Sequence, residues 1–121
     1  MTDSITAYRF AELQLDLNSK SLLNGEERIV LPERNFQLLV LLAQSSPEPV
    51  TKEDLFEALW GNTVVSEWSL FRLVSDTRQL IGDDGEHQNI IRTARGVGFY
   101  LAECKPVTEQ PVARKDKQGW L

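Results

Sequence analysis

The chain has 121 residues, 41% hydrophobic and 26% charged, a composition typical of one soluble globular domain and not of a disordered or fibrous protein. One cysteine and one histidine exclude an intrachain disulfide and a zinc site built from several such ligands. The net charge of −5 excludes a surface that is basic all round, so any anion-binding face must be local. With neither a signal-peptide pattern nor a long apolar segment, a cytoplasmic location is expected.

The N-terminal part of the chain predicts an antiparallel β-meander. Leu13, Leu15 and Leu17 alternate with polar residues, which is the period of a strand with one buried face. Asn24-Gly25 is a dipeptide that favours a tight hairpin turn. The β-branched residues of Arg28-Ile-Val-Leu31 then predict a returning strand.

Two helices are predicted next. Pro32 stands where a first helical residue would, and apolar residues at helical spacing continue to about Ser45. Thr51 and Asp54 have the spacing of a capping box, with aspartate in the place of the usual glutamate. This pattern predicts a short second helix that ends before Gly61.

A third helix is predicted over about residues 67–81, with Ser66 as its N-cap. At ~100° per residue its side chains separate into two faces. The inward face contains Leu70, Val74, Thr77 and Ile81. The outward face contains Trp68, Arg72, Ser75 and Gln79, flanked by Ser69 and Arg78. Such groups can contact base edges in a major groove, but any amphipathic surface helix also has a polar face, and both interpretations stay open here.

A β-hairpin is predicted near the C-terminus. Two strands, at residues 90–93 and 99–101, are joined by the glycine-containing turn 94–98. Arg95 lies at the tip and Arg92 nearby, an arrangement that suits a minor groove or a phosphate backbone. A surface hairpin that needs glycine only for its turn has the same pattern.

Residues that could support catalysis are not grouped along the sequence. His87 lies in a polar loop, and Cys104 has no identifiable base. The pairs Asp83-Asp84 and Glu26-Glu27 have the pattern of solvated turns, whereas catalytic carboxylates need burial to shift their pKa values. We therefore predict a protein that is not an enzyme and holds neither a cofactor nor a metal ion.

The ordered elements resemble the OmpR/PhoB-type winged-helix DNA-binding domain over about residues 8–103. The motifs that carry the resemblance are Leu31-Pro32, Phe36 with the leucine-rich run after it, Val50-Thr-Lys-Glu-Asp-Leu55, Ala58-Leu-Trp60-Gly61, Val65-Ser66, Arg78, Leu80-Ile-Gly-Asp83 and Ile91-Arg-Thr-Ala-Arg-Gly-Val-Gly-Phe99. The resemblance implies an α+β winged helix-turn-helix fold with an N-terminal meander, three helices and a C-terminal wing. It also implies sequence-specific binding of double-stranded DNA for transcription regulation, with helix 67–81 in the major groove and wing 94–98 in the minor groove.

The family's DNA-facing positions carry over residue by residue. They are Trp68, Ser69, Arg72 and Ser75 on the recognition helix, Arg78 and Thr93 at phosphate contacts, Trp60 beside the backbone and Arg95 on the wing. Ser75 and Asp76 stand where family members often have basic residues. Fewer basic contacts imply a lower non-specific affinity and a weaker salt dependence.

The resemblance also implies partners. Loop 61–66 is where such proteins often meet RNA polymerase, and the family suggests homodimers on repeated half-sites. An exposed patch of Trp68 and Phe71 is the alternative, because it would suit a protein-protein interaction module instead of a DNA reader.

The tail and the order of the elements lead to a further expectation. The tail from Lys105 contains two prolines and few apolar residues, which predicts a domain over residues 1–104 and a linker over residues 105–121. Because the winged-helix pattern starts close to Met1, we expect no receiver domain on this chain to control DNA binding. An N-terminal domain of this type is similar to that of ToxR/CadC-like one-component regulators. Basic residues before Trp120 suit a membrane anchor after residue 121, although an ordinary disordered tail explains them equally well.

Overall fold

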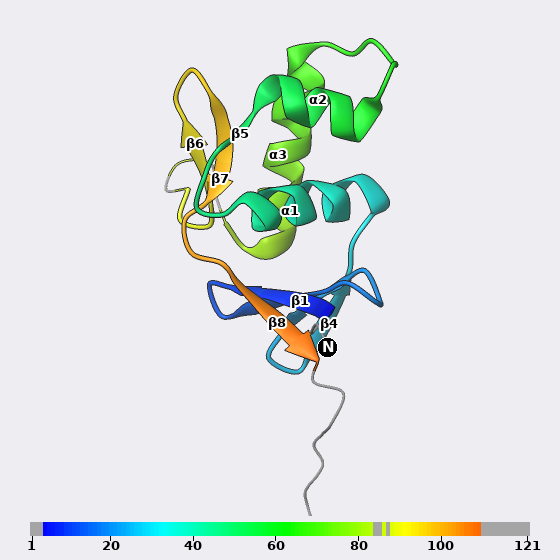
Figure 1. The fold of residues 1–121 in the computed structure, drawn as a ribbon, viewed down its shortest axis with the longest axis vertical. Helices are drawn as coiled ribbons and strands as arrows, with labels where there is room; N and C mark the ends of the chain where they lie inside the picture. Colours follow the sequence, from blue (N-terminus) through cyan, green and yellow to red (C-terminus); the bar gives the residue numbers. More distant parts are fainter. Residues whose placement is uncertain (1–3, 84–85, 87, 110–121) are drawn as a thin grey trace, which may run out of the picture.

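The computed structural model describes residues 4–83, 86 and 88–109. The predicted α+β arrangement of a meander, three helices and a hairpin is confirmed. Figure 1 shows the N-terminal sheet at one end of the molecule, with the helices and the hairpin toward the other end. The meander consists of the antiparallel strands β1 (Ser4–Phe10), β2 (Leu13–Asp16), β3 (Ser21–Asn24) and β4 (Glu27–Val30).

A further strand, β8 (Lys105–Glu109), pairs antiparallel with β1 and completes a five-stranded sheet (Figure 1). Residues 105–109, which were predicted to begin a linker, therefore form a strand of this sheet. Pro106 favoured a linker, but an edge strand tolerates proline and needs only backbone groups to pair. The basic segment before Trp120 lies outside the described residues.

The three helices are α1 (Glu33–Ser45), α2 (Lys52–Trp60) and α3 (Glu67–Ile81). Thr51 is the N-cap of α2, as predicted, and its Oγ1 accepts a hydrogen bond from the backbone N–H of Asp54 at 3.1 Å. Ser66 precedes α3 in an extended conformation, although its side chain makes no cap hydrogen bond. The left-handed Gly82, with φ of 83°, ends α3.

The hairpin consists of β6 (Ile91–Ala94) and β7 (Gly98–Leu101), and β7 also pairs with the short strand β5 (Val50–Thr51). Strand β5 was not expected, because two residues are too few to show strand periodicity. Gly98 is required at this junction, since a Cβ there would lie 1.8 Å from the carbonyl oxygen of Val50. The hairpin is thereby attached to the start of α2.

A single hydrophobic core joins the N-terminal sheet, the helices and the hairpin. Its largest fully buried side chains include Leu15 and Leu22 of the sheet, Leu38, Leu39 and Leu42 of α1, Leu55, Leu70 and Val74 of α2 and α3, and Ile91 and Leu101 of the hairpin. Because α3 and the hairpin share this core, their outer surfaces are held in a fixed relation. No helix in the described part of the chain is both long and apolar enough to span a bilayer.

Candidate nucleic-acid interface

Helix α3 has the two faces predicted from its periodicity. Leu70, Val74, Thr77 and Ile81 are buried, whereas Trp68, Arg72, Ser75 and Gln79 are exposed. Trp68 retains 64% of its accessible surface, an unusual exposure for an indole. The outward face is therefore free to meet a partner along its whole length.

Arg72 lies between an aromatic neighbour, Trp68, and an acidic neighbour, Asp76, on this face. Its guanidinium carbon is 5.3 Å from the centroid of the Trp68 ring, and its Nε is 3.9 Å from Oδ2 of Asp76. The side chain of Arg72 is nevertheless 65% exposed, so its donors remain accessible. The indole supports the guanidinium from one side, and the carboxylate faces it from the next turn of the helix.

Arg78, for which a phosphate contact beside the outward face is expected, packs against the hairpin. The residue is buried, and its Nε and Nη2 donate to the carbonyl oxygen of Ile91 at 3.2 and 2.9 Å. Nη2 also donates to Oγ1 of Thr93 at 3.2 Å, and the guanidinium lies 6.0 Å from the Phe99 ring. Helical spacing placed Arg78 beside the outward face, but the hairpin packs over it. Arg78 thus joins α3 to the wing.

Asp83 is buried, although its sequence has the pattern of a solvated turn. Its carboxylate accepts hydrogen bonds from the backbone N–H groups of Asn89, Ile90 and Ile91 at 2.9, 3.0 and 2.9 Å. The expected solvation of this residue is wrong, because residues 89–91 direct three backbone N–H donors at its carboxylate. Asp83 thereby joins the end of α3 to the start of β6.

The wing turn lies beside the N-terminal half of α3. Lys52, Phe71 and residues 93–99 line a hollow of about 130 Å³, and Arg95 is part of it. The Phe71 and Phe99 rings meet edge-on, with 6.2 Å between their centroids. Lys52 Nζ lies 5.7 Å from the centroid of the Phe71 ring. Phe71 is exposed, as predicted, but it belongs to the junction between helix and wing.

Two basic residues at this surface were missed by the sequence analysis. Lys52 lies between α3 and the wing, with its Nζ 3.3 Å from Oε2 of Glu67. Arg34, in the first turn of α1, lies 5.2 Å above the Trp60 ring. A second hollow, of about 330 Å³, is lined by Arg34, Trp60, Trp68, Ser69, Arg72, Leu73 and Asp76. No local pattern signals either residue, because both reach α3 only through tertiary packing.

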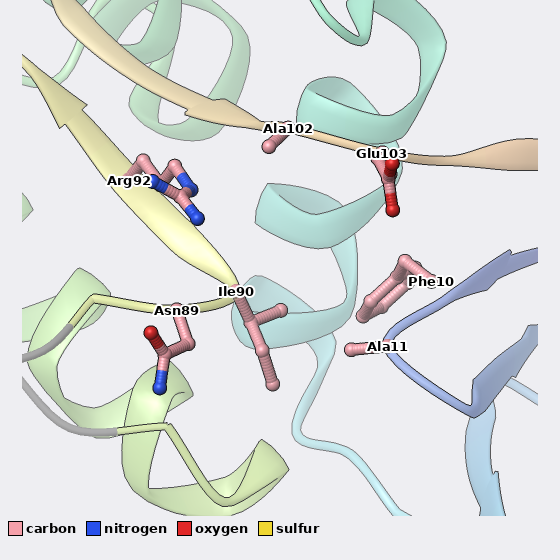
Figure 2. Close-up of a pocket in the computed structure, with 7 residues that line it drawn as sticks. All are labelled: Phe10, Ala11, Asn89, Ile90, Arg92, Ala102 and Glu103. Carbon is pink, nitrogen blue, oxygen red and sulfur yellow. The ribbon is translucent and has the colours of Figure 1, made fainter.

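A third hollow, of about 330 Å³, lies between the N-terminal sheet and the base of the wing (Figure 2). Its lining residues are Phe10, Ala11, Asn89, Ile90, Arg92, Ala102 and Glu103. Figure 2 shows the Arg92 side chain directed toward this hollow, whereas Arg95 shares its hollow with Phe71 of α3. Of the two wing arginines, Arg95 is thus the one associated with α3.

The Cys104 thiol is not activated for nucleophilic chemistry. Burial raises the pKa of the Cys104 thiol to about 11, so the thiol is protonated at neutral pH and is a poor nucleophile. Among the described residues there is no group of three or more histidine, cysteine, aspartate or glutamate side chains able to hold a metal ion. The exposed groups of α3 and the wing are suited to binding by hydrogen bonds and charge.

These elements define a winged-helix domain. The chain belongs to the family described as "Transcriptional regulatory protein, C terminal", which matches residues 25–101 and whose domain is of the OmpR/PhoB type. It is 34% identical over 91 residues to the transcriptional regulator HilA of Salmonella typhimurium, covering 75% of this chain and 16% of HilA. The chain therefore spans a small part of that relative. The predicted absence of enzyme activity agrees with these relatives, which are transcriptional regulators.

Solved structures share the fold. The response regulator DrrB of Thermotoga maritima, an OmpR/PhoB homologue, superposes with a TM-score of 0.74 and 30% identity over 81% of this chain and 45% of DrrB. The Klebsiella pneumoniae RstA DNA-binding domain, solved in complex with the RstA box, has a TM-score of 0.72 and 24% identity, covering 79% of this chain and 96% of that one. The E. coli CadC DNA-binding domain has a TM-score of 0.72 and 20% identity, covering 88% and 100%. The expected likeness to CadC is thus present in the fold.

Proposed function

We propose that this domain binds double-stranded DNA sequence-specifically and regulates transcription, with α3 in the major groove and wing residues 94–98 in the adjacent minor groove. One observation carries the proposal: Phe71 of α3 and Arg95 of the wing line one hollow, beside an outward helix face that is exposed. The buried Arg78 holds helix and wing together. A helix and a hairpin in such a fixed relation suit two neighbouring grooves.

Base reading is assigned to the outward face of α3. Arg72, a donor of paired hydrogen bonds, would recognise guanine, whose major-groove edge presents two acceptors. The hydroxyls of Ser69 and Ser75 can donate to or accept from several bases. Trp68 supplies an apolar contact and supports the guanidinium of Arg72.

Backbone contacts are assigned around this face. The Thr93 hydroxyl oxygen accepts from Arg78, which leaves its hydrogen available for a phosphate. Arg78 acts by positioning Thr93 and the wing. Arg95 reaches the minor groove, where a narrow groove attracts arginine. Trp60, with Arg34 above its ring, supports the backbone on the side of α1.

Two protein contacts complete the proposal. Loop 61–66 would contact RNA polymerase. Val64 in this loop is 96% exposed, and an exposed apolar side chain is suited to a protein contact. Two copies of the domain would bind repeated half-sites as a homodimer.

The test is fluorescence anisotropy with mixed-sequence duplexes at low and moderate salt. We expect weak binding that falls with salt, and Arg95→Ala should lower the salt slope by ~1. Arg9→Ala is the matched control, because Arg9 is an exposed arginine on β1 of the N-terminal sheet. Binding that is absent at every salt concentration would contradict DNA recognition and favour the alternative, a protein-binding patch of Trp68 and Phe71.

A further inference from the structure

A carboxylate lies on the helix face assigned to base reading. The side chain of Asp76 is 54% exposed, and it lines the same hollow as Trp68, Ser69 and Arg72. Near DNA, a negative side chain is repelled by the phosphates. Its position in the middle of α3 therefore needs a reason other than general affinity.

Helix stability does not supply that reason. The ion pair from Asp76 Oδ2 to Arg72 Nε is 3.9 Å long and exposed to solvent, and pairs of this kind contribute little. Within the described chain the Asp76 carboxylate accepts no hydrogen bond, so all of its acceptor sites are open to a partner. Asp76 is thus an exposed acceptor one helical turn from the donor Arg72.

We propose that Asp76 determines specificity by accepting a hydrogen bond from the N4 amino group of a cytosine close to the base that Arg72 contacts. Cytosine presents an amino donor in the major groove, and an ionised carboxylate only accepts. At guanine or thymine this carboxylate faces acceptors, and at adenine the N7 acceptor lies beside the N6 amino donor, so each of these bases weakens binding relative to cytosine. This inference rests on the proposed function, because it requires α3 to lie in the major groove.

The experiment is selection from a library of randomised duplexes with the wild-type chain and Asp76→Ala, followed by titration of the selected duplex and of its cytosine variants. The wild-type chain should enrich cytosine at one position of the duplex. In Asp76→Ala the preference for cytosine over the other bases at that position should fall by about 5- to 100-fold. Asp76→Asn should shift the preference toward adenine, which suits an amide. Binding of Asp76→Ala to random duplexes should become tighter than that of wild type.

Two controls separate the effect from charge and from Arg72. Glu27→Gln removes one negative charge from β4, in the N-terminal sheet, and should leave the selected sequence and the random-duplex affinity unchanged. In an Arg72→Ala background, Asp76→Ala should still remove the cytosine preference. If it has no effect in that background, Asp76 acts only through Arg72 and direct reading is wrong.

The remaining outcomes are distinguishable. If Asp76→Ala selects the same cytosine as wild type, the inference is overturned while the proposed function stands. If the wild-type chain neither binds duplexes at low salt nor enriches any sequence, the proposed function itself fails. Thermal unfolding of each variant confirms that the exposed substitutions leave the fold intact.

Discussion

The guanidinium of Arg78 donates two hydrogen bonds to the backbone carbonyl oxygen of Ile91, from Nε at 3.2 Å and from Nη2 at 2.9 Å. One buried side chain thus connects α3 to β6, the first strand of the wing. This contact holds α3 against the wing. We therefore expect a substitution of the buried Arg78 to alter the exposed surface that α3 and the wing form, although Arg78 is not part of that surface.

Arg78→Ala is expected to lower the free energy of unfolding by about 2–3 kcal/mol, because hydrogen bonds to a charged donor are lost and the Ile91 carbonyl remains buried. Urea denaturation measures this change. Arg78→Lys should recover only part of it, since an ammonium cannot reproduce the guanidinium geometry. Unchanged stability together with a salt slope of DNA binding lower by ~1 would instead support the direct phosphate contact first expected from the sequence.

Asp83→Asn should destabilise the start of the wing. The carboxylate accepts from three backbone N–H groups, and an amide replaces one acceptor oxygen with a donor. We expect a loss of about 1–3 kcal/mol and faster amide hydrogen exchange at residues 89–91. Glu26→Gln, in the exposed turn between β3 and β4, is the control. Equal exchange rates in the two variants would show that Asp83 is not the anchor.

Gly98→Ala should disturb the pairing of β5 with β7. The added Cβ would lie 1.8 Å from the carbonyl oxygen of Val50, a backbone atom that cannot move alone. The expected destabilisation is about 1–3 kcal/mol or more, measured by thermal unfolding. Val97→Ala changes an exposed neighbouring side chain and should have a small effect. Equal melting temperatures for the two variants would contradict the close approach.

Arg72→Ala tests base reading by the recognition helix. The loss of a bidentate contact should relax the preference at one base position by about 1–3 kcal/mol. Titration of a selected duplex and its single-base variants measures this preference. A loss of affinity that is equal for every sequence would show that Arg72 contacts phosphate instead of a base.

Cys104 should resist alkylation at neutral pH. Its raised pKa, about 11, keeps the thiol protonated in the folded domain, and only the thiolate reacts. The iodoacetamide reaction rate should therefore rise with pH up to about that value, whereas the unfolded chain should react at lower pH. A folded protein that reacts as fast as the urea-unfolded one at pH 8 would contradict the burial of this thiol.

Much of the architecture follows from local patterns. The alternation of Leu13 and Leu15 with polar residues indicates a strand, and the spacing from Leu70 to Ile81 separates the two faces of α3. Thr51 caps α2 as its spacing predicts. These features depend on residues only a few positions apart, so sequence periodicity and capping chemistry determine them.

The tertiary structure decided the remaining features, because they depend on which distant segments meet. Arg78 and Asp83 are polar residues that a local pattern places at the surface, and they are buried because the wing and the loop before it bring backbone partners to them. The pairing of β8 with β1 and the approach of Arg34 to Trp60 join segments far apart in the chain. A hydrogen-bond partner supplied by packing leaves no periodic trace in the sequence. The sequence by itself therefore determined the meander, the three helices, the hairpin and the outward face of α3, and packing decided the strands β5 and β8 and which polar groups connect the elements.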